Sequence, residues 1–482
     1  MCIRDSIDGV DWGLVNPWIE DGCLEYFSQI INDGVKGTLV STVPPFTLPA
    51  WTSIFTGVNP GKHGITDNLI RLKNKFVPAL SRWRGKPLIW SLIGRKGLKS
   101  IVVNDPVTYP PEPINGIMVT GFLTPPNSEV YTYPPEIKDE IDKASGGYIP
   151  ELPPNYGKLI AHNRIEAYNY IQQFAQKTAY AALYLMKNYE WNIFNVTFTS
   201  TDRLQHFYFH EKHLLKKHYM WLDSIMGKIM DLASNENANI IVVSDHGFAP
   251  IHKSIHINTI LAKEGLIKIK NNKLHRTMLK LNLNAENITR FLKRMHLHEI
   301  ITKIIPENLK QTLPSKHSKP IAKAVAKLYT GAGIFINKNL CHNYQTIRNL
   351  IIQKLLSIKD NNRRAIAKVY KREEVLWGPY ITRAPDLFVI PKEGYYLSTA
   401  IKDKIFSKPI QPESGIQRTG DHRMKGIFIA YGPDIKEGIK LKKSIFTWDV
   451  APLILHMLGL PIPNYMDGHI RKEIFKRKRV CS

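Results

Sequence analysis

The sequence contains few cysteines and no long apolar run. Four cysteines occur in 482 residues, Cys2, Cys23, Cys341 and Cys481, and none belongs to a C-x-x-C pair. This argues against a disulfide framework and against a thiolate zinc site. No run of about 18 apolar residues is present, and the start MCIRDS lacks the apolar core of a signal peptide. We therefore expect a cytoplasmic protein without a transmembrane segment.

The N-terminus is also poor in apolar residues at a position where a strand is expected. The segment MCIRDSIDGVDW reaches Asp8 with one apolar residue among the last four. A buried strand of an α/β sheet usually carries a continuous apolar run of about 4 to 8 residues. This start predicts a truncated or replaced first strand, and a longer native N-terminus would leave room for a targeting signal.

Acidic residues are scarce relative to basic ones. The chain has 66 Lys and Arg against 41 Asp and Glu, a formal net charge of +25. Clustered basic residues are the electrostatic signature of nucleic-acid binding. The aromatic residues that single-strand binders use for base stacking are not interleaved with them. We expect a basic surface that attracts anionic phosphate-ester substrates, rather than a dedicated nucleic-acid platform. The sequence carries no signal for an oligomeric state.

Apolar bursts alternate with amphipathic segments along the chain. The bursts predict strands within Lys99–Asp105, Trp191–Asp202, Ala238–Gly247, Ala384–Ile390 and Lys425–Pro433. This alternation predicts an α/β fold with a mostly parallel central sheet and helices on both faces. In open sheets of this kind, ligands bind at the carboxyl ends of the strands.

The pattern changes between residues 258 and 383. The segment AENITRFLKRMHLHEIITKII carries Ile288, Phe291, Leu292 and Met295 on one helical stripe, with a basic opposite face. A basic amphipathic helix can bind a membrane surface or a partner helix, but we expect its apolar stripe to pack on the protein. We predict that 258–383 is an inserted, largely helical cap, and that 1–257 and 384–482 form the catalytic domain.

Carboxylates and imidazoles gather at predicted strand ends. The set comprises Asp8, Asp202, His206, Asp245, His246 and His422. In TSTDRLQH the Asp and His are four residues apart, which places both on one face of a first helical turn. SDHG ends another buried strand, and GDHR forms a glycine-flanked loop. A fourth segment, PPFTLPAWTSIFTGVNPGKHG, places the Thr47 hydroxyl at a predicted helix start, where free backbone N–H groups can bind an anion.

Taken in order, Asp8, FTLPAWTS, TDRLQH, SDHG and GDHR resemble the alkaline phosphatase superfamily, and within it the type I phosphodiesterase and nucleotide pyrophosphatase family. The resemblance extends from Asp8 to the closing DVAPLILHMLGLPIPNYMDG. It implies an alkaline phosphatase-like fold and a hydrolase that uses two divalent metal ions. Zinc is favoured, with manganese or iron as alternatives.

The resemblance also implies roles for individual residues. One metal ion would be held by Asp8, Thr47, Asp245 and His246, and the other by Asp202, His206 and His422. Thr47 would be the nucleophile, giving a phospho-threonine intermediate, and Asn68 in GITDN would donate to a phosphate oxygen. Each residue also has a structural interpretation.

Without the other motifs, Thr47 would be a helix cap worth about 1 kcal/mol, and Asn68 a residue that bonds its own turn. Asp421 is expected in the loop or as a partner of His422. His252 and His256 are expected outside the ligand set.

The choice among superfamily activities depends on residues that are missing. TLPAW lacks the C/S-x-P-x-R pattern of sulfatases, and alkaline phosphatases and cofactor-independent phosphoglycerate mutases use serine. We expect hydrolysis of phosphodiester or nucleotide pyrophosphate bonds. The alternatives are a phosphonoacetate hydrolase-like enzyme, which shares the Thr and Asn, a phosphomonoesterase, or a non-catalytic anion or nucleic-acid binding module. The complete ligand set argues against the binding module. The leaving group is expected to contact the loops of Gly121–Pro154 and the cap.

Overall fold

The computed structural model describes residues 1–72, 75–153, 156–268, 321–322, 324–326, 332–410 and 415–476. The basic amphipathic segment predicted at 285–305 lies outside the described residues. Within these ranges, no helix has both the length and the apolar character needed to cross a membrane.

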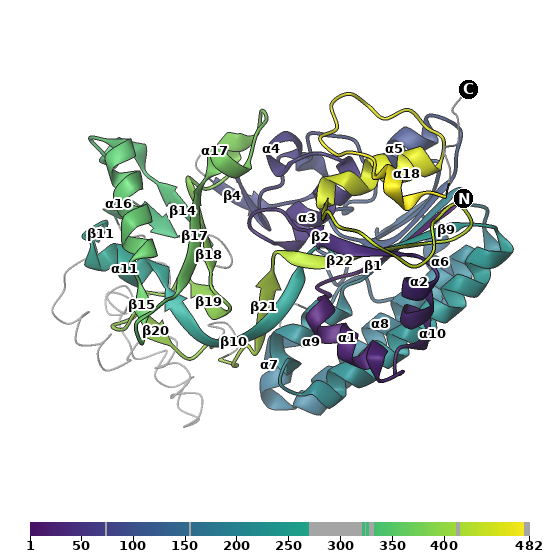
Figure 1. Ribbon diagram of the computed structural model, residues 1–482, viewed down its shortest axis with the longest axis horizontal. Coiled ribbons are helices and arrows are strands. Elements are labelled where there is room, and N and C mark those ends of the chain that lie inside the picture. The colour runs from purple at the N-terminus through teal and green to yellow at the C-terminus, as the bar shows by residue number, and fades with distance from the viewer. Residues whose placement is uncertain are drawn as a thin grey trace.

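A ten-stranded sheet forms the centre of the molecule (Figure 1). Its strands are β1 (Cys2–Ile7), β2 (Val35–Val40), β5 (Ser100–Asp105), β6 (Gly116–Thr120), β7 (Thr132–Tyr133), β8 (Ile193–Phe198), β9 (Asn239–Val243), β22 (Lys425–Tyr431), β23 (Ile439–Lys440) and β24 (Ile445–Phe446). The order is β23-β2-β22-β9-β1-β8-β5-β6-β7, with β24 also on β2. β22 runs antiparallel to β2 and β9, and β7 antiparallel to β6, whereas the other pairs are parallel. The predicted mostly parallel sheet is confirmed.

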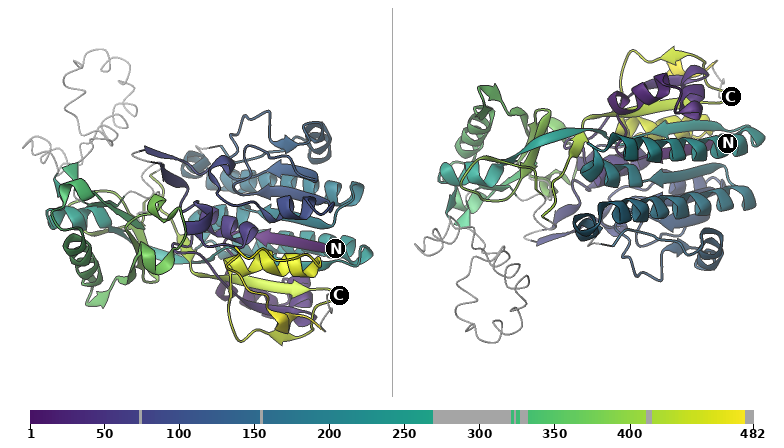
Figure 2. Two further views of the ribbon diagram at one scale, coloured as in Figure 1. Left: turned by 90° about the horizontal axis from the view of Figure 1, so that it is seen from above. Right: turned by 90° about the horizontal axis from the view of Figure 1, so that it is seen from below.

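Helices cover both faces of this sheet, as the views from above and below show (Figure 2). One face packs on α2 (Glu25–Asn32), α8 (Arg164–Asn188) and α10 (Lys212–Asn235), and the other on α3 (Thr47–Thr56), α5 (Ile89–Gly94) and α18 (Val450–Met457). Successive residues of a strand point to opposite faces, so Ile101 and Val103 join the first core while Val102 joins the second. Burial on both sides explains why β5, β8 and β9 are buried along their whole length.

The first residues of the chain form a strand, β1, and a truncated or replaced native strand at this position stays a prediction. β1 lies between β8 and β9 and pairs in parallel with both. Cys2, Ile3, Ser6 and Ile7 are fully buried. Pairing to two neighbours satisfies the backbone of this strand on both edges, and this stabilises it without a continuous apolar run.

In its described part, the insertion contains both strands and helices, and much of the segment predicted to be helical lies outside the described residues. Its four-stranded antiparallel sheet contains β13 (Ala324–Ala326), β14 (Gly333–Ile336), β18 (Leu387–Pro391) and β17 (Ile366–Lys371). The helices are α11 (Ile257–Lys263), α16 (Tyr344–Leu356) and the short α17 (Arg372–Val375). β18 was predicted as a strand of the catalytic domain, and it pairs here with strands of the insertion. The domain boundaries at 258 and 383 remain a prediction.

One long strand connects the two parts. β10 (Gly247–His256) pairs near its start with β21 (Gly420–Arg423) and near its end with β19 (Gly394–Ser398) and β20 (Phe406–Ser407). In Figure 1, β10 runs from the central sheet to the insertion. It begins directly after Asp245 and His246, so the insertion is attached next to predicted site residues.

Candidate active site

The predicted site residues meet at the carboxyl edge of the central sheet. Asp8 directly follows β1, and Asp245 and His246 follow β9. Thr47 begins α3, the helix after β2, and α9 (Ser200–Tyr208), after β8, carries Asp202 and His206. His422 lies on β21 and reaches the same edge. The chain thus brings together seven residues from segments that are far apart in the sequence.

The first group of side chains centres on His246. Its Nε2 atom lies 3.3 Å from Asp8 Oδ1, 3.3 Å from Asp245 Oδ2 and 3.4 Å from Thr47 Oγ1. The other oxygens of the carboxylates have donors, since Trp51 Nε1 donates to Asp8 Oδ2 and Gly9 N to Asp245 Oδ1, both at 3.4 Å. The carboxylate oxygens that face the imidazole are therefore held in fixed directions.

These two facing oxygens are well suited to a divalent cation. Asp8 Oδ1 and Asp245 Oδ2 are buried and have no hydrogen-bond partner within the described residues. Burial and the nearby Asp202 raise the pKa of Asp8 to about 7, and burial and Asp8 raise the pKa of Asp245 well above its usual range. Burial holds the pKa of His246 well below its usual value, so the imidazole is neutral. Two carboxylates and a neutral imidazole form a ligand set typical of zinc.

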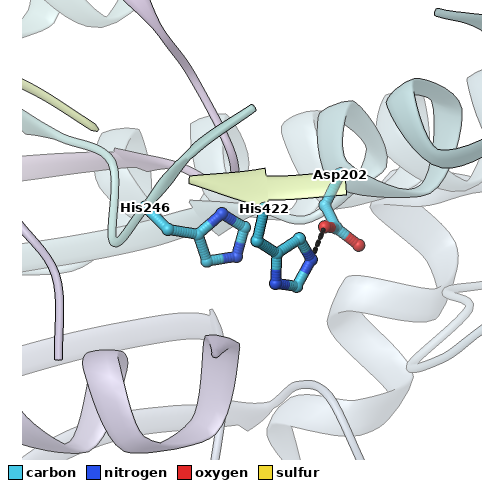
Figure 3. A group of neighbouring side chains, drawn as sticks. All are labelled: Asp202, His246 and His422. Carbon is cyan, nitrogen blue, oxygen red and sulfur yellow. Dashed lines mark hydrogen bonds and ion pairs between the residues drawn. The ribbon is translucent and has the colours of Figure 1, made fainter. Parts of the chain in front are cut away.

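The second group comprises Asp202, His206 and His422. Asp202 Oδ1 lies 3.0 Å from His422 Nε2 and 3.3 Å from His206 Nε2, and the two Nε2 atoms are 3.2 Å apart. His422 Nδ1 donates to the Pro45 carbonyl at 2.9 Å, which directs Nε2 into the group. Figure 3 shows Asp202, His246 and His422 as neighbours. The ring centroids of His246 and His422 are 3.8 Å apart. The two groups are thus contiguous.

The charges in the second group are strongly coupled. Burial would raise the pKa of Asp202, but His206 and His422 hold it well below its usual range. Burial opposes protonation of His422, but its hydrogen bond to Asp202 raises its pKa. Burial and the Arg418 charge lower the pKa of His206 to about 4. A divalent cation would take the place of the proton shared by Asp202 and His422.

Thr47 is the first residue of α3, and its hydroxyl does not cap the helix. Phe46 occupies the cap position, and no side chain makes the cap hydrogen bond. The Thr47 side chain instead lies against His246 and is 8% exposed. The cap interpretation of Thr47 is therefore wrong. At this position the hydroxyl is next to the first free N–H groups of α3.

No hydrogen bond joins Asn68 to either group within the described residues. Its backbone N–H donates to Asp67 Oδ1 at 2.5 Å, and its carbonyl accepts from Ala79 N at 3.1 Å. The Asn68 Oδ1 atom is buried without a hydrogen-bond partner within the described residues. His252 and His256 also lie outside the groups, since His252 is exposed and His256 Nε2 lies 2.9 Å from Ser407 Oγ.

One residue of this region, Arg418, was not predicted from the sequence, and Asp421 was expected only in the loop or as a partner of His422. Asp421 forms a further group with His206 and His422, in which one donor atom from each lies within 4.8 Å of the others. Arg418 Nη2 lies 3.2 Å from Asp421 Oδ1. The i,i+3 spacing of these two residues in RTGDHR was the available signal, and it is as typical of a surface ion pair.

The chain matches a known protein family. Residues 6–426 match the sequence profile of the family described as type I phosphodiesterase / nucleotide pyrophosphatase. No curated protein sequence matches the chain. Among solved structures, the chain is similar to human ectonucleotide pyrophosphatase/phosphodiesterase 5, with 16% identity, 97% of each chain covered and a TM-score of 0.53. The murine protein is 16% identical to this chain, with 96% of each chain covered and a TM-score of 0.53.

A third solved structure has a different activity. Phosphonoacetate hydrolase from Sinorhizobium meliloti 1021, in complex with phosphonoformate, is 16% identical over 94% of this chain and 95% of its own, with a TM-score of 0.59. At this identity the likeness establishes the fold, and the profile match over most of the chain establishes the family.

The fold and the profile match define a phosphoryl hydrolase of the alkaline phosphatase superfamily, whose members are metal-dependent. Within that superfamily, the chain belongs to the type I phosphodiesterase/nucleotide pyrophosphatase family.

Proposed function

We propose that the protein hydrolyses phosphodiester or nucleotide pyrophosphate bonds with Thr47 as the nucleophile. The observation that carries this proposal is the arrangement around His246. Two buried carboxylate oxygens without hydrogen-bond partners lie 3.3 Å from its Nε2 atom, and the Thr47 hydroxyl lies 3.4 Å from the same atom. A hydroxyl that shares a candidate metal group with two carboxylates is in a position to be activated.

The metal ions would be held by the two groups described above. Asp8, Asp245, His246 and Thr47 would hold one, and Asp202, His206 and His422 the other, with zinc favoured by the three imidazoles. When bound, such ions neutralise phosphate charge and lower the pKa of a coordinated hydroxyl or water. The metal ions would supply this chemistry. The protein would hold the ligand side chains in fixed orientations around them.

The side chains and backbone of the protein carry out the remaining steps. Thr47 Oγ1 attacks phosphorus and the bond to the leaving oxygen breaks, which gives a phospho-threonine. Water then attacks that phosphorus, restores the Thr47 hydroxyl and releases the phosphate product. The N–H groups at the start of α3 point toward the same position, where they stabilise the negative phosphoryl oxygens. Asn68 is proposed as a further donor to one of these oxygens.

A relative supports this role for the threonine. The murine ectonucleotide pyrophosphatase/phosphodiesterase 5 has also been solved as an inactive threonine-to-alanine variant in complex with AMP. Thr47 with Asn68, rather than serine with arginine, also favours a diester, which carries one negative charge fewer than a monoester.

The test is a substrate panel on zinc-loaded protein. Bis(p-nitrophenyl) phosphate and a nucleotide anhydride should be hydrolysed, and phosphonoacetate and a sulfate ester should not. Release of phosphate from phosphonoacetate with no diester hydrolysis would assign the protein to the phosphonoacetate hydrolase-like alternative. Turnover of none of the substrates, with both metal ions bound, would favour the binding module.

A further inference from the structure

An arginine lies directly against the second group of candidate ligands. Arg418 Nη2 contacts His206 Nδ1, and it lies 3.0 Å from His206 Nε2 and 3.2 Å from Asp421 Oδ1. The residue is 7% exposed, so its charge is largely removed from water. The contacts Thr47–His246, His246–His422, His422–His206 and His206–Arg418 connect the proposed nucleophile to this guanidinium.

The backbone on both sides of Arg418 is fixed. Its own N–H donates to the Pro409 carbonyl at 2.7 Å, and the N–H of Thr419 donates to the His206 carbonyl at 2.8 Å. The guanidinium also lies over the Tyr396 ring, 5.0 Å from its centre. Because Thr419 is bonded to His206 itself, the guanidinium keeps its position relative to α9 and the ligands on it.

The charge of Arg418 is only partly compensated. Its one carboxylate partner within the described residues is Asp421, through a single contact. The Nε atom is buried without a hydrogen-bond partner, and Nη1, which is not buried, makes no hydrogen bond within the same residues. A buried guanidinium has five N–H donors, and unused ones favour an anion.

A second arginine beside the site provides a contrast. Arg203 Nη2 contacts both oxygens of Glu151 at 3.3 Å, and its guanidinium stacks 4.4 Å above the Phe122 ring. Its charge is therefore balanced within the protein. Arg203 Nε, and Nε and Nη2 of Arg423, also lack hydrogen-bond partners within the described residues. Arg418 differs from these two arginines because it lies against the candidate ligand His206.

We propose that Arg418 contacts the second negative charge of those phosphate substrates that carry one. The proposal rests on the proposed function, because the same Thr47 would attack phosphorus. The second charge has two possible positions. In a monoester it lies on the phosphoryl group, and in a phosphate anhydride it lies on the leaving group.

The chemistry balances in both cases. The Thr47 oxygen forms a bond to phosphorus as the bond to the leaving oxygen breaks, and the leaving group takes up a proton. Water then cleaves the phospho-threonine, restores the hydroxyl and releases orthophosphate from a monoester or a phosphomonoester from an anhydride. One water molecule is consumed. A monoesterase was disfavoured from the sequence because threonine rather than serine stands at the nucleophile position, and Arg418 supplies a positive charge beside the site from another segment.

The first test is binding to zinc-loaded protein, measured by isothermal titration calorimetry. The probes are orthophosphate, largely a dianion above neutral pH, and dimethyl phosphate, a monoanion of similar shape. Arg418→Gln removes the charge and retains donors, and it should weaken orthophosphate binding by at least about tenfold while changing dimethyl phosphate binding much less. Arg418→Lys should restore part of the affinity. Equal changes for the two probes would overturn the proposal.

The second test compares three substrates. The comparison distinguishes a second negative charge on the phosphoryl group from one on the leaving group. These are p-nitrophenyl phosphate, ADP-ribose as an anhydride, and bis(p-nitrophenyl) phosphate as the singly charged reference. Arg418→Gln should lower kcat/KM for one or both of the first two, relative to the third. Loss confined to p-nitrophenyl phosphate assigns the charge to the phosphoryl group, and loss confined to ADP-ribose assigns it to the leaving group.

Two controls separate a charge contact from a structural role. Arg95→Gln makes the same charge change at an exposed residue that follows α5 and precedes the amino end of β5, at the edge opposite the site, and should leave the substrate ratios unchanged. Zinc content by elemental analysis should be equal in the parent and in Arg418→Gln. A loss of zinc together with equal loss on all three substrates would show that Arg418 only supports His206. If the parent hydrolyses none of the substrates, the proposed function fails, and the calorimetry still decides the role of Arg418.

Discussion

At the scale of single residues, Thr47 is the side chain on which the proposed chemistry depends most. Its hydroxyl faces His246 and does not cap α3. Thr47→Ala should therefore lower kcat for bis(p-nitrophenyl) phosphate by at least about 1000-fold, with little change in the free energy of unfolding. Thr47→Ser retains the hydroxyl and should keep part of the activity.

The measurement for Thr47 is steady-state kinetics together with mass spectrometry of acid-quenched protein. A phosphate adduct on Thr47 should accumulate in the parent and be missing in the alanine variant. Near-parental rates in Thr47→Ala would mean that water attacks phosphorus directly. Zinc content should be largely retained, because the second group is intact and the first keeps three ligands.

His63 should make stability depend on pH for a reason that lies outside the site. Its Nδ1 accepts from the Ile65 N–H at 3.1 Å, its Nε2 lies 3.0 Å from Ser53 Oγ, and burial followed by the Arg84 charge lowers its pKa to about 3 from a usual value of 6.5. Below pH 6.5 the imidazole of His63 binds a proton in the unfolded chain but stays neutral in the folded protein. The free energy of unfolding therefore falls as the pH falls from 6.5 toward 3.

Chemical denaturation of the parent and of His63→Asn as a function of pH tests this expectation. The stability advantage of the parent should shrink by about 1.4 kcal/mol per pH unit below pH 6.5. A difference between the two proteins that stays constant from pH 7 to pH 4 would contradict a neutral buried imidazole.

The predictability of the site follows from where its residues stand in the chain. Asp202 with His206, and Asp245 with His246, could be predicted because each pair is local and follows a strand whose carboxyl end must lie at one edge. Arg418 could not, because its position depends on the bond from Thr419 to the His206 carbonyl, between residues more than 200 positions apart. The helix-cap interpretation of Thr47 failed because the cap position falls one residue earlier, on Phe46.

At the scale of secondary-structure elements, α3 must be held at its end in order to present Thr47 at its start. Gly57 ends the helix in the left-handed region, at φ +69°, where an added Cβ would lie 2.8 Å from Met466 Sδ and 3.2 Å from Pro452 Cδ. Gly57→Ala should lower the free energy of unfolding by about 1–2 kcal/mol for the backbone, and by a further 1–3 kcal/mol, roughly, for the overpacking.

Gly22→Ala is the matched control for this prediction. Gly22 has φ +71° and nothing within 4 Å of an added Cβ, so it should show the backbone cost alone. Urea unfolding of both variants gives the difference. Equal destabilisation of the two would mean that the end of α3 is not tightly packed against the loop that carries Met466.

Strands that are buried on both faces of the central sheet were predicted well. Strands that depend mainly on hydrogen bonding to neighbouring strands were predicted poorly. β5, β8, β9 and β22 contain runs of apolar residues, and these strands were predicted. β1 is stabilised by ladders on both edges, which leave no apolar signature in the sequence. In the insertion, short strands such as β13 and β14 pair only with one another and with β18, and such non-local pairing is not visible in hydrophobic periodicity.

At the scale of the whole molecule, metal binding should control stability. Burial raises the pKa of both Asp8 and Asp245, and a neighbouring carboxylate adds to this effect at each, Asp202 at Asp8 and Asp8 at Asp245, so their ionised forms are costly when no cation is present. Zinc at about 100 times its dissociation constant should therefore stabilise the fold by about 2.7 kcal/mol, seen as a higher melting temperature that a chelator reverses. Asp245→Asn should lose most of this response and should be at least as stable as the parent in the presence of chelator. A parent melting temperature indifferent to both zinc and chelator would contradict the metal sites.

The distribution of charge should affect substrate capture. A cleft of about 1490 Å³ lies between the central sheet and the insertion, and Lys212, Arg363, Arg364, Lys392 and Lys425 are among the residues that line it. Raising the ionic strength from about 0.05 M to 0.5 M shortens the screening length severalfold, so KM for ADP-ribose should rise while kcat holds. KM for bis(p-nitrophenyl) phosphate should rise less. Parallel changes for the two substrates would indicate a general effect of salt on the protein.

The connection through β10 has a consequence for the design of variants. The chain leaves this strand at His256 and returns at Gly394, which pairs with Ile251 of the same strand in parallel register. The start and end of the insertion are thus fixed to one rigid support, whose first residue follows His246. An insertion from another protein could be grafted between these two points as an exchangeable module, giving hybrid enzymes that share one reaction centre and differ in the molecules they admit to it.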